Sequence, residues 1–245
     1  MTMEFGRVCD IGKRDNNEDG ILTLEMYADI GFFAVADGLG GHSYGELASK
    51  CVLDKAERNL IVGGEFECSE GNMKHLLESS QESLVDLIES NVLYKRMRTT
   101  MTALLINNGE AVWGHIGDSR LYFFRDNNIL EITADHSVAY MSYMSGEISY
   151  NDIRKSDEQS RLIRTMGAAE KFKPDIHKKV DIKPGDAFLL CTDGFWENID
   201  EKQMTDSLKK SKTASRWIAK MVRIVKENTK SCDDCDNFSA ITVFV

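Results

Sequence analysis

The sequence predicts an α+β fold, a four-layer α/β/β/α sandwich in which two packed antiparallel β-sheets are flanked by helix pairs. Two observations lead to this prediction. The hydrophobic pattern reads as strands, a helix pair, more strands and a second helix pair. The strands of the middle block are joined by short Asn- and Asp-containing turns, and such short connections require antiparallel neighbours. With 245 residues, 42% of them hydrophobic, the chain can bury one sizeable core or two small ones.

The first half of the chain supplies a hairpin and a helix pair. Residues 31–36 form a short apolar run closed by an Asp-Gly pair, which is typical of a buried strand that ends in a turn. Residues 21–27 alternate between polar and apolar side chains and are predicted to be its hairpin partner. Apolar residues at helical spacing predict helices from about 45 to 61 and from about 73 to 92.

The second half supplies the remaining strands and the second helix pair. Four strands joined by turns are predicted over 99–106, 111–116, 121–124 and 129–132. A strand, two helices and a final strand follow over 187–191, 201–209, 214–228 and 239–245. Residues 135–170 lose clear periodicity and are expected to form a mobile insertion near the site that the strands support. Since no linker or repeat interrupts the pattern, we expect a single domain over residues 1–245.

Charge and composition argue against several kinds of partner. Forty Asp and Glu residues against thirty Lys and Arg residues give a net charge of −10, which does not favour binding to nucleic acid. No apolar run approaches the roughly 20 residues of a membrane span, and the N-terminus has no export pattern. We therefore expect a cytoplasmic protein whose six cysteines are reduced. The lone CxxC at 232–235 lacks the second ligand pair of a zinc site and is interpreted as a loop with two thiols.

Four aspartates lie at the ends of predicted strands. Asp37 and Asp193 each follow an apolar strand and precede a glycine; Asp118 closes a strand, and Asp236 precedes the last one. An Asp-Gly pair alone is usually only a turn. Together with the acidic cluster at 14–19, however, these residues are hard to explain as turns. Strand ends of one sandwich converge, and carboxylates and carbonyls are the ligands that Mg²⁺ and Mn²⁺ prefer, so the pattern predicts an oxygen-lined two-metal site.

Taken in order, the motifs resemble the metal-dependent protein serine/threonine phosphatases of the protein phosphatase 2C (PPM) family, and more closely their bacterial branch. The resemblance spans nearly the whole chain and rests on RDNNED at 14–19, VADGLGGHSYGELAS at 35–49, TTMTALLI at 99–106, GHIGDSRLYFFRDNNI at 114–129, CTDGFWENI at 191–199 and DNFSAITVFV at 236–245. It implies the sandwich fold predicted above. It also implies that a water shared by two Mn²⁺ or Mg²⁺ ions attacks phosphorus in line.

The resemblance implies a set of metal ligands. Asp37 would bridge both ions, and Asp193 and Asp236 would complete the coordination of one of them. The carbonyl of Gly38 would bind the other ion. Two further acidic residues would hold the waters of that second ion, namely Glu18 and Asp19.

The resemblance suggests roles for three other residues, and for two of them an alternative stays open. Arg14 would hold the phosphoryl oxygens, because a planar guanidinium binds them bidentately. Asp118 matches the ligand of a third, weaker metal in bacterial members, and a simple strand-end turn remains the alternative. His42 is close enough in sequence to the Asp-Gly pair to suggest a general acid. We favour a loop-orienting role for it, with the leaving group protonated by metal-bound water, and leave the general acid unassigned.

The expected substrate is a phosphorylated protein, hydrolysed in opposition to a serine/threonine kinase by a monomeric enzyme. Residues 135–170 match the family's flap, which would select substrates. Two alternatives stay open: a catalytically silent binding or regulatory module of the same fold, and a phosphatase of a small phosphorylated metabolite. A cysteine-dependent phosphatase is excluded, since only four residues separate Cys9 from Arg14 where that loop needs five.

Overall fold

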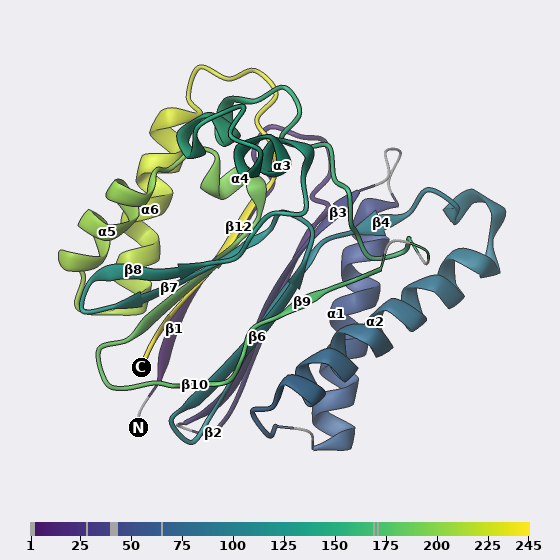
Figure 1. The fold of residues 1–245 in the computed structure, drawn as a ribbon, viewed down its shortest axis with the longest axis horizontal. Helices are drawn as coiled ribbons and strands as arrows, with labels where there is room; N and C mark the ends of the chain where they lie inside the picture. The colour runs from purple at the N-terminus through teal and green to yellow at the C-terminus, as the bar shows by residue number, and fades with distance from the viewer. Residues whose placement is uncertain (1–2, 28, 40–43, 65, 169, 171) are drawn as a thin grey trace.

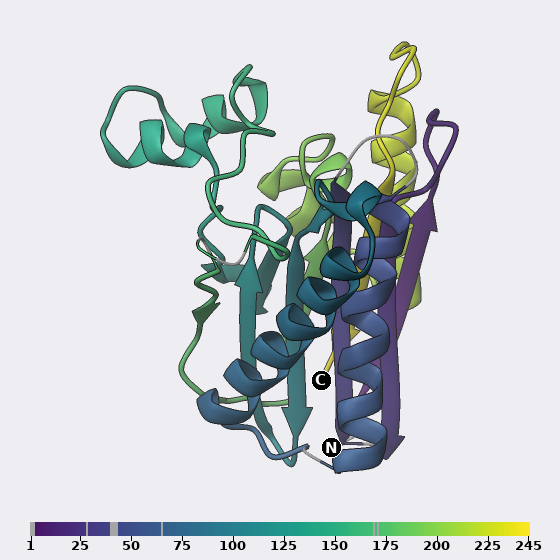
Figure 2. The same cartoon turned by 90° about the vertical axis from the view of Figure 1, so that its right-hand side faces the viewer.

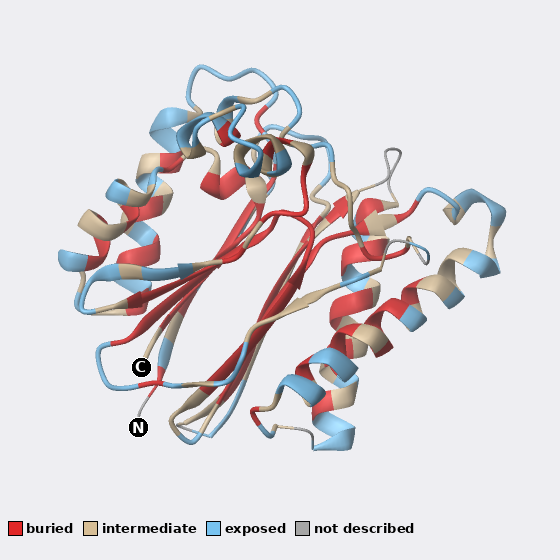
Figure 3. Cartoon of the chain, in the orientation of Figure 1, coloured by how far each residue is buried: buried red, intermediate tan, exposed pale blue. Residues whose placement is uncertain are grey.

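The computed structural model describes residues 3–245, apart from residues 28, 40–43, 65, 169 and 171. Two antiparallel sheets pack face to face, and helices cover their outer faces (Figure 1). The buried residues gather along the two sheets and on the helix faces turned toward them (Figure 3). This is the predicted α/β/β/α sandwich, so the fold class is confirmed.

One sheet has seven strands. Its main path is β10 (Val180–Asp181), β6 (Glu110–Ile116), β5 (Met101–Asn107), β3 (Ile30–Leu39) and β2 (Asp19–Tyr27). Two short strands extend it, β4 (Arg98–Thr99) beside β3 and β9 (Asp175–Ile176) beside β6. Its outer face is covered by the predicted first helix pair, α1 (Gly45–Gly63) and α2 (Glu70–Ser90) (Figure 2).

The other sheet has five strands in the order β1 (Glu4–Asp10), β12 (Phe238–Phe244), β11 (Ala187–Cys191), β7 (Arg120–Arg125) and β8 (Asn128–Ile132). Its outer face packs against α4 (Asp193–Trp196), α5 (Glu201–Lys209) and α6 (Ala214–Asn228). Among the described residues, no helix combines the length and the apolar character needed to cross a membrane.

Alternation along β3 explains why this strand is apolar on both faces. Phe32 and Ala34 point into the layer under α1 and α2, whereas Phe33 and Val35 point into the layer between the sheets. The inter-sheet layer is largely aromatic and aliphatic, and it includes Phe188, whose ring is stacked on that of Phe123. A strand in the middle of such a sandwich therefore reads as a continuous hydrophobic run.

The predicted hairpins and helices are confirmed, and several short or peripheral elements were missed. Strand β1 has a charged residue at every third position and lies at the sheet edge, so its sequence gives a weak strand signal. The 135–170 segment, expected to be irregular, contains the helix α3 (Val138–Met144) and a 3₁₀ helix, η2 (Tyr150–Lys155). These helices project from one end of the sandwich (Figure 2). The one-turn helix α4 was also missed because the Asp-Gly pair was interpreted as a turn.

Replacing Phe188 with Ala should lower the free energy of unfolding by about 3–5 kcal/mol, because it leaves a cavity between the two sheets. Phe188 is fully buried, with its ring centroid 4.7 Å from that of Phe123 and 6.1 Å from that of Trp113. The measurement is urea unfolding in EDTA, so that bound metal does not contribute. Leu130→Ala is the control, since Leu130 is 55% exposed, and an equal loss in both variants would contradict the assignment of this layer as core.

Candidate active site

The predicted site aspartates meet where strands of both sheets begin or end. Asp37, late in β3, lies opposite Asp19, the first residue of β2, in the register of the hairpin. Asp118 lies in the turn between β6 and β7, and Asp193 begins α4 just after β11. Asp236 lies two residues before β12. The sandwich therefore brings carboxylates from both sheets to one end of the molecule.

Burial and mutual repulsion raise the pKa values of four of these carboxyls, namely Asp19, Asp37, Asp118 and Asp193. The pKa of Asp37 lies well above its ordinary value, through burial first and then through the charges of Asp193, Asp19 and Asp118. Burial, together with the charges of Asp193 and Asp236, raises the pKa of Asp19 to about 8. Burial and then Asp193 raise the pKa of Asp118 well above its ordinary value. Carboxyls that repel one another in this way are stabilised when a divalent cation takes the place of protons.

The five site aspartates are called the acidic cluster below. Glu197 is a further member of this cluster that was not predicted from the sequence. Burial, followed by the charges of Asp193 and Asp236, raises its pKa to about 9. Its charge also raises the pKa of Asp118. The signal was present in the sequence: Glu197 follows Asp193 by four residues, which places both on the same side of one helical turn.

Glu18 and the Gly38 carbonyl oxygen converge on a second part of the cluster. A Cβ atom on Gly45 would lie 2.5 Å from Cδ of Glu18 and 2.6 Å from the carbonyl oxygen of Gly38. A Cβ on Gly38 would lie 2.1 Å from the carbonyl oxygen of Gly45, so only glycine fits there. The backbone of Glu18 is fixed by Asn237, whose Oδ1 accepts its N–H at 2.8 Å. The predicted ligand Gly38 thus lies beside Glu18, which is expected to hold water molecules bound to the same metal ion.

Threonine hydroxyls hold the backbone and side chains of the cluster in place. The Asp37 N–H donates to Oγ1 of Thr100 at 2.9 Å, and Oγ1 of Thr99 donates to the Asp37 carbonyl at 2.8 Å. Oγ1 of Thr192 donates to Oδ2 of Asp19 at 2.9 Å. Because these bonds cross between strands, the repelling carboxyls cannot separate without breaking the ends of both sheets.

Arg14 lies at the exposed rim of the acidic cluster. Its guanidinium contacts Asp236 and Asp234, with an N–O distance of 3.2 Å in each case. The side chain is 42% exposed, and it lines a cavity of about 350 Å³ together with Lys13, Asp15, Asn16, Glu18, Asp234, Asp236 and Asn237. A cation at this rim is placed to meet an anionic group that approaches the cluster from solvent.

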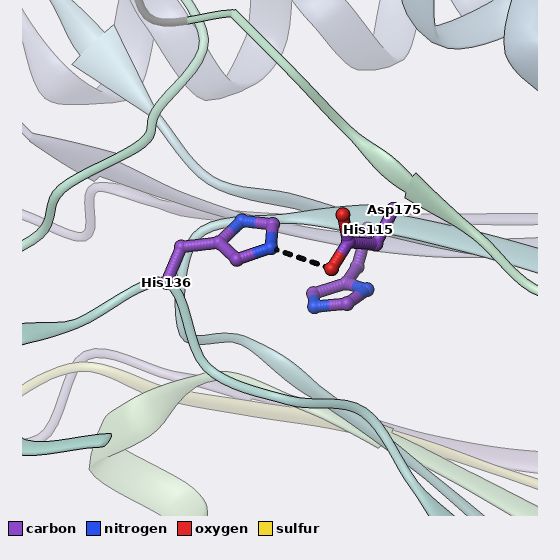
Figure 4. A group of neighbouring side chains, drawn as sticks. All are labelled: His115, His136 and Asp175. Atoms are coloured by element: carbon purple, nitrogen blue, oxygen red, sulfur yellow. Dashed lines mark hydrogen bonds and ion pairs between the residues drawn. The ribbon is translucent and has the colours of Figure 1, made fainter. Parts of the chain in front are cut away.

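Three of the five histidines concern the site or its surroundings. His42, the candidate general acid, lies outside the described residues. The rings of His115 and His136 stack with centroids 4.7 Å apart, and Asp175 lies beside them (Figure 4). The Gly117 N–H donates to Nδ1 of His136 at 3.1 Å, so Nε2 carries the proton and donates to Oδ2 of Asp175 at 3.2 Å.

These hydrogen bonds argue against a metal between His136 and Asp175, although the spacing of the group alone would allow one. Both ring nitrogens of His136 are engaged, and a metal at Nε2 would leave an N–H on Nδ1 facing the N–H of Gly117. Burial lowers the pKa of His136 to about 4, which keeps the ring neutral. We interpret the group as a structural link between the 135–170 segment and the turn that carries Asp118.

The donor set of the acidic cluster fits hard divalent cations. It consists of carboxylate oxygens and one backbone carbonyl, the donors that suit Mg²⁺ and Mn²⁺. The structure therefore brings together every predicted metal-ligating residue, adds Glu197 and places Arg14 at the edge. The individual roles of these residues stay predictions.

Comparison with known proteins identifies the family. The model of the family described as protein phosphatase 2C matches residues 11–234. A putative protein phosphatase 2C-type from Streptococcus pyogenes is 28% identical over 209 residues, covering 84% of each chain. The serine/threonine phosphatase stp of Listeria monocytogenes is 28% identical over 227 residues, covering 90% of this chain and 88% of its own.

A solved structure agrees with these sequence matches. The catalytic domain of the serine/threonine protein phosphatase PstP, in complex with two manganese ions, superposes with a TM-score of 0.84 at 23% identity, covering 99% of this chain and 97% of its own. At this identity the likeness shows the fold. With the family match, it follows that the chain belongs to the protein phosphatase 2C family. The resemblance drawn from the motifs is confirmed, and with it the enzyme class, a protein phosphatase.

The metal-free protein should lose stability as the pH rises from about 4 to about 9. The folded pKa values of Asp19, about 8, and Glu197, about 9, exceed the unfolded values. The stabilising contribution of these groups is therefore complete below the unfolded pKa and is lost as the pH rises through the folded one. The measurement is the Tm in EDTA across this range. Asp19→Asn should flatten the profile and Mn²⁺ should restore stability at high pH; a profile that Mn²⁺ leaves unchanged would contradict the metal site.

Proposed function

We propose that the chain is a metal-dependent protein serine/threonine phosphatase that hydrolyses phosphoserine and phosphothreonine. The observation that carries the proposal is the cluster of buried, mutually repelling carboxyls with an arginine at its rim. Two divalent ions, when bound, would generate a water nucleophile at neutral pH and stabilise the charge on the attacking and leaving oxygens. The chain then needs no nucleophilic side chain of its own.

The proposed division of labour follows the position of each residue. Asp37 would bridge the two ions, since its carboxyl lies among those of Asp19, Asp118 and Asp193. Asp193 would hold one ion together with the last-strand ligand, Asp236. The Gly38 carbonyl would face the other ion, with the waters of that ion held by Glu18 and Asp19. We propose that Asp118 and Glu197 hold a third ion, because the charge of Asp193 raises the pKa of both and the charge of Glu197 raises the pKa of Asp118.

Arg14 would orient the phosphoryl group. Its guanidinium already lies beside Asp236, and its five N–H donors exceed the two contacts that the neighbouring aspartates use. The remaining N–H groups at the mouth of the cavity can donate two parallel hydrogen bonds to phosphoryl oxygens. This arrangement would hold the phosphorus next to the carboxylate cluster while the peptide remains outside.

The larger context of the enzyme is also a proposal. We propose a single catalytic domain whose flap, residues 135–170, contacts the substrate protein. Exposed apolar side chains on α3 support this role, namely Met141 and Met144, 55% and 67% exposed. The relatives named serine/threonine phosphatase support a phosphoprotein substrate. We further propose a cytoplasmic monomer that opposes a serine/threonine kinase.

Phosphate release from a phosphothreonine peptide should require Mn²⁺ or Mg²⁺ and should be abolished by EDTA. Asp193→Ala should lower kcat by at least about 10³-fold, because it removes a ligand from the metal pair. Asp86→Ala, a change of an exposed aspartate on α2, is the matched control and should leave turnover unchanged. Full activity of Asp193→Ala would refute the site. Absence of turnover with every metal would support the silent binding module, and turnover of small phosphate esters alone would support the metabolite phosphatase.

Arg14→Ala should reduce kcat/KM for the phosphopeptide by about 10²-fold, the loss expected for charge-assisted bidentate contacts to phosphate. Because Arg14 is not a metal ligand, the affinity for Mn²⁺, measured by calorimetry, should not fall. Arg14→Lys should recover only part of the activity, since a lysine cannot bind bidentately. A loss of Mn²⁺ binding equal to the loss of activity would contradict a phosphate-binding role.

A further inference from the structure

Two thiols lie on the loop that leads to the proposed metal ligand Asp236. The loop joins α6 to β12, and Cys232 and Cys235 lie on either side of a bend at residues 233–234. Both cysteines are free; Cys232 is exposed and Cys235 is buried. Among the described residues, neither belongs to a group of side chains spaced to hold a metal, so metal binding does not explain the CxxC spacing.

The two cysteines already lie against each other. Sγ of Cys235 is 3.6 Å from the carbonyl oxygen of Cys232 and donates a hydrogen bond to the carbonyl of Thr229 at 3.2 Å. Because Cys232 is exposed, its side chain can rotate toward Cys235 without displacing packed atoms.

The thiol loop is fastened to the turn that carries Arg14. The backbone N–H of Lys13 donates to the carbonyl oxygen of Cys235 at 3.0 Å. The ammonium of the same lysine donates to the carbonyl oxygen of Cys232. Lys13 therefore holds both ends of the CxxC segment, and its neighbour in sequence is the proposed phosphate-binding residue.

The contacts continue from this turn into the active site. Arg14 pairs with Asp234, inside the CxxC segment, and with Asp236, directly after it. The two backbones touch so closely that a Cβ on Gly12 would lie 2.1 Å from the carbonyl oxygen of Asp236. A change in the shape of residues 232–235 must therefore move the phosphate-binding side chain, a metal ligand, or both.

We propose that Cys232 and Cys235 are a redox-sensitive thiol pair, and that their oxidation to a disulfide lowers phosphatase activity by displacing Arg14 and Asp236. The inference rests on the proposed function. The oxidant class is a low-molecular-weight disulfide, which exchanges with exposed thiols. Closing the ring would pull the sulfur of Cys235 away from its hydrogen bond with Thr229 and tighten the bend between the cysteines.

The exchange balances in two steps. The Cys232 thiolate attacks one sulfur of the small disulfide, forms a mixed disulfide and displaces one small thiolate. The Cys235 thiolate then attacks the sulfur of Cys232 and displaces the second small thiolate. The two protons lost by the protein thiols pass to the released thiolates. The protein pair is thereby oxidised, and the small disulfide is reduced to two thiols.

The test is treatment of the reduced full chain with bis(2-hydroxyethyl) disulfide. We expect a mass loss of two hydrogen atoms, mapped to one peptide that holds both cysteines. We expect kcat/KM for the phosphothreonine peptide to fall about tenfold, as for a misplaced binding group, and dithiothreitol to restore it. The affinity for Mn²⁺, measured by calorimetry, should fall as well, because the loop positions Asp236.

Matched variants locate the effect. Cys232→Ser, a change at an exposed position, should keep its activity in the oxidant, and Cys235→Ser should do the same. Cys9→Ser removes another exposed cysteine and should behave like the parent chain. The inference is overturned if no Cys232–Cys235 disulfide forms, or if it forms while kcat/KM and Mn²⁺ affinity stay unchanged. A reduced chain without turnover would contradict the proposed function instead, and mass and Mn²⁺ affinity would still test the thiol pair.

Discussion

Repulsion among carboxyls that cannot move apart is the constraint on which the rest of the site depends. Asp19, Asp37 and Asp118 lie close enough to raise one another's pKa or that of their neighbours, and burial prevents water from screening them. Such a cluster costs folding free energy unless protons or cations neutralise it. The sandwich bears this cost because hydrogen bonds made by the hydroxyls of Thr99, Thr100 and Thr192, two as donors and Thr100 as acceptor, fix the strand ends. Strain of this kind, held by a rigid scaffold, is typical of binding sites.

A buried ion pair near the acidic cluster is an example of charges that have a structural role in this protein. The Arg120 guanidinium donates to both carboxylate oxygens of Asp135, at 2.8 and 2.6 Å, and lies 3.5 Å from the ring centroid of Trp196. Nε1 of Trp196 in turn donates to the carbonyl of Asp118 at 3.0 Å. Every charge in this group has a partner, and the group fixes the turn of Asp118 to the entry of the 135–170 segment. In the acidic cluster, among the described residues, only the rim residue Asp236 is paired with an arginine, which distinguishes a site prepared for cations from a structural pair.

The sequence predicted the features that repeat locally, and it missed those that depend on tertiary contacts. Asp37 and Asp193 were found because each follows an apolar run, and this pattern is visible in the local sequence alone. Glu197 was missed because its position depends on a one-turn helix that the Asp-Gly pair does not reveal. The link between His136 and Asp175 joins residues 39 apart in sequence, through strand pairing of β9 with β6. Hydrophobic periodicity predicts strands and their ends, but it does not predict the contacts that depend on the order of the strands in a sheet.

The floor and the rim of the site are built differently, and this difference decides where regulation can act. The floor consists of side chains on strand ends, held on both sides by the two sheets. The rim consists of the 11–18 and 229–237 loops, joined mainly by hydrogen bonds such as those from Nδ2 of Asn237 to the carbonyls of Ile11 and Asn16. A local change in either loop can shift Arg14 without exposing a hydrophobic core. Because the rim also carries the proposed metal ligand Asp236, a surface modification there can alter phosphate binding and metal binding while the fold and the floor ligands remain in place.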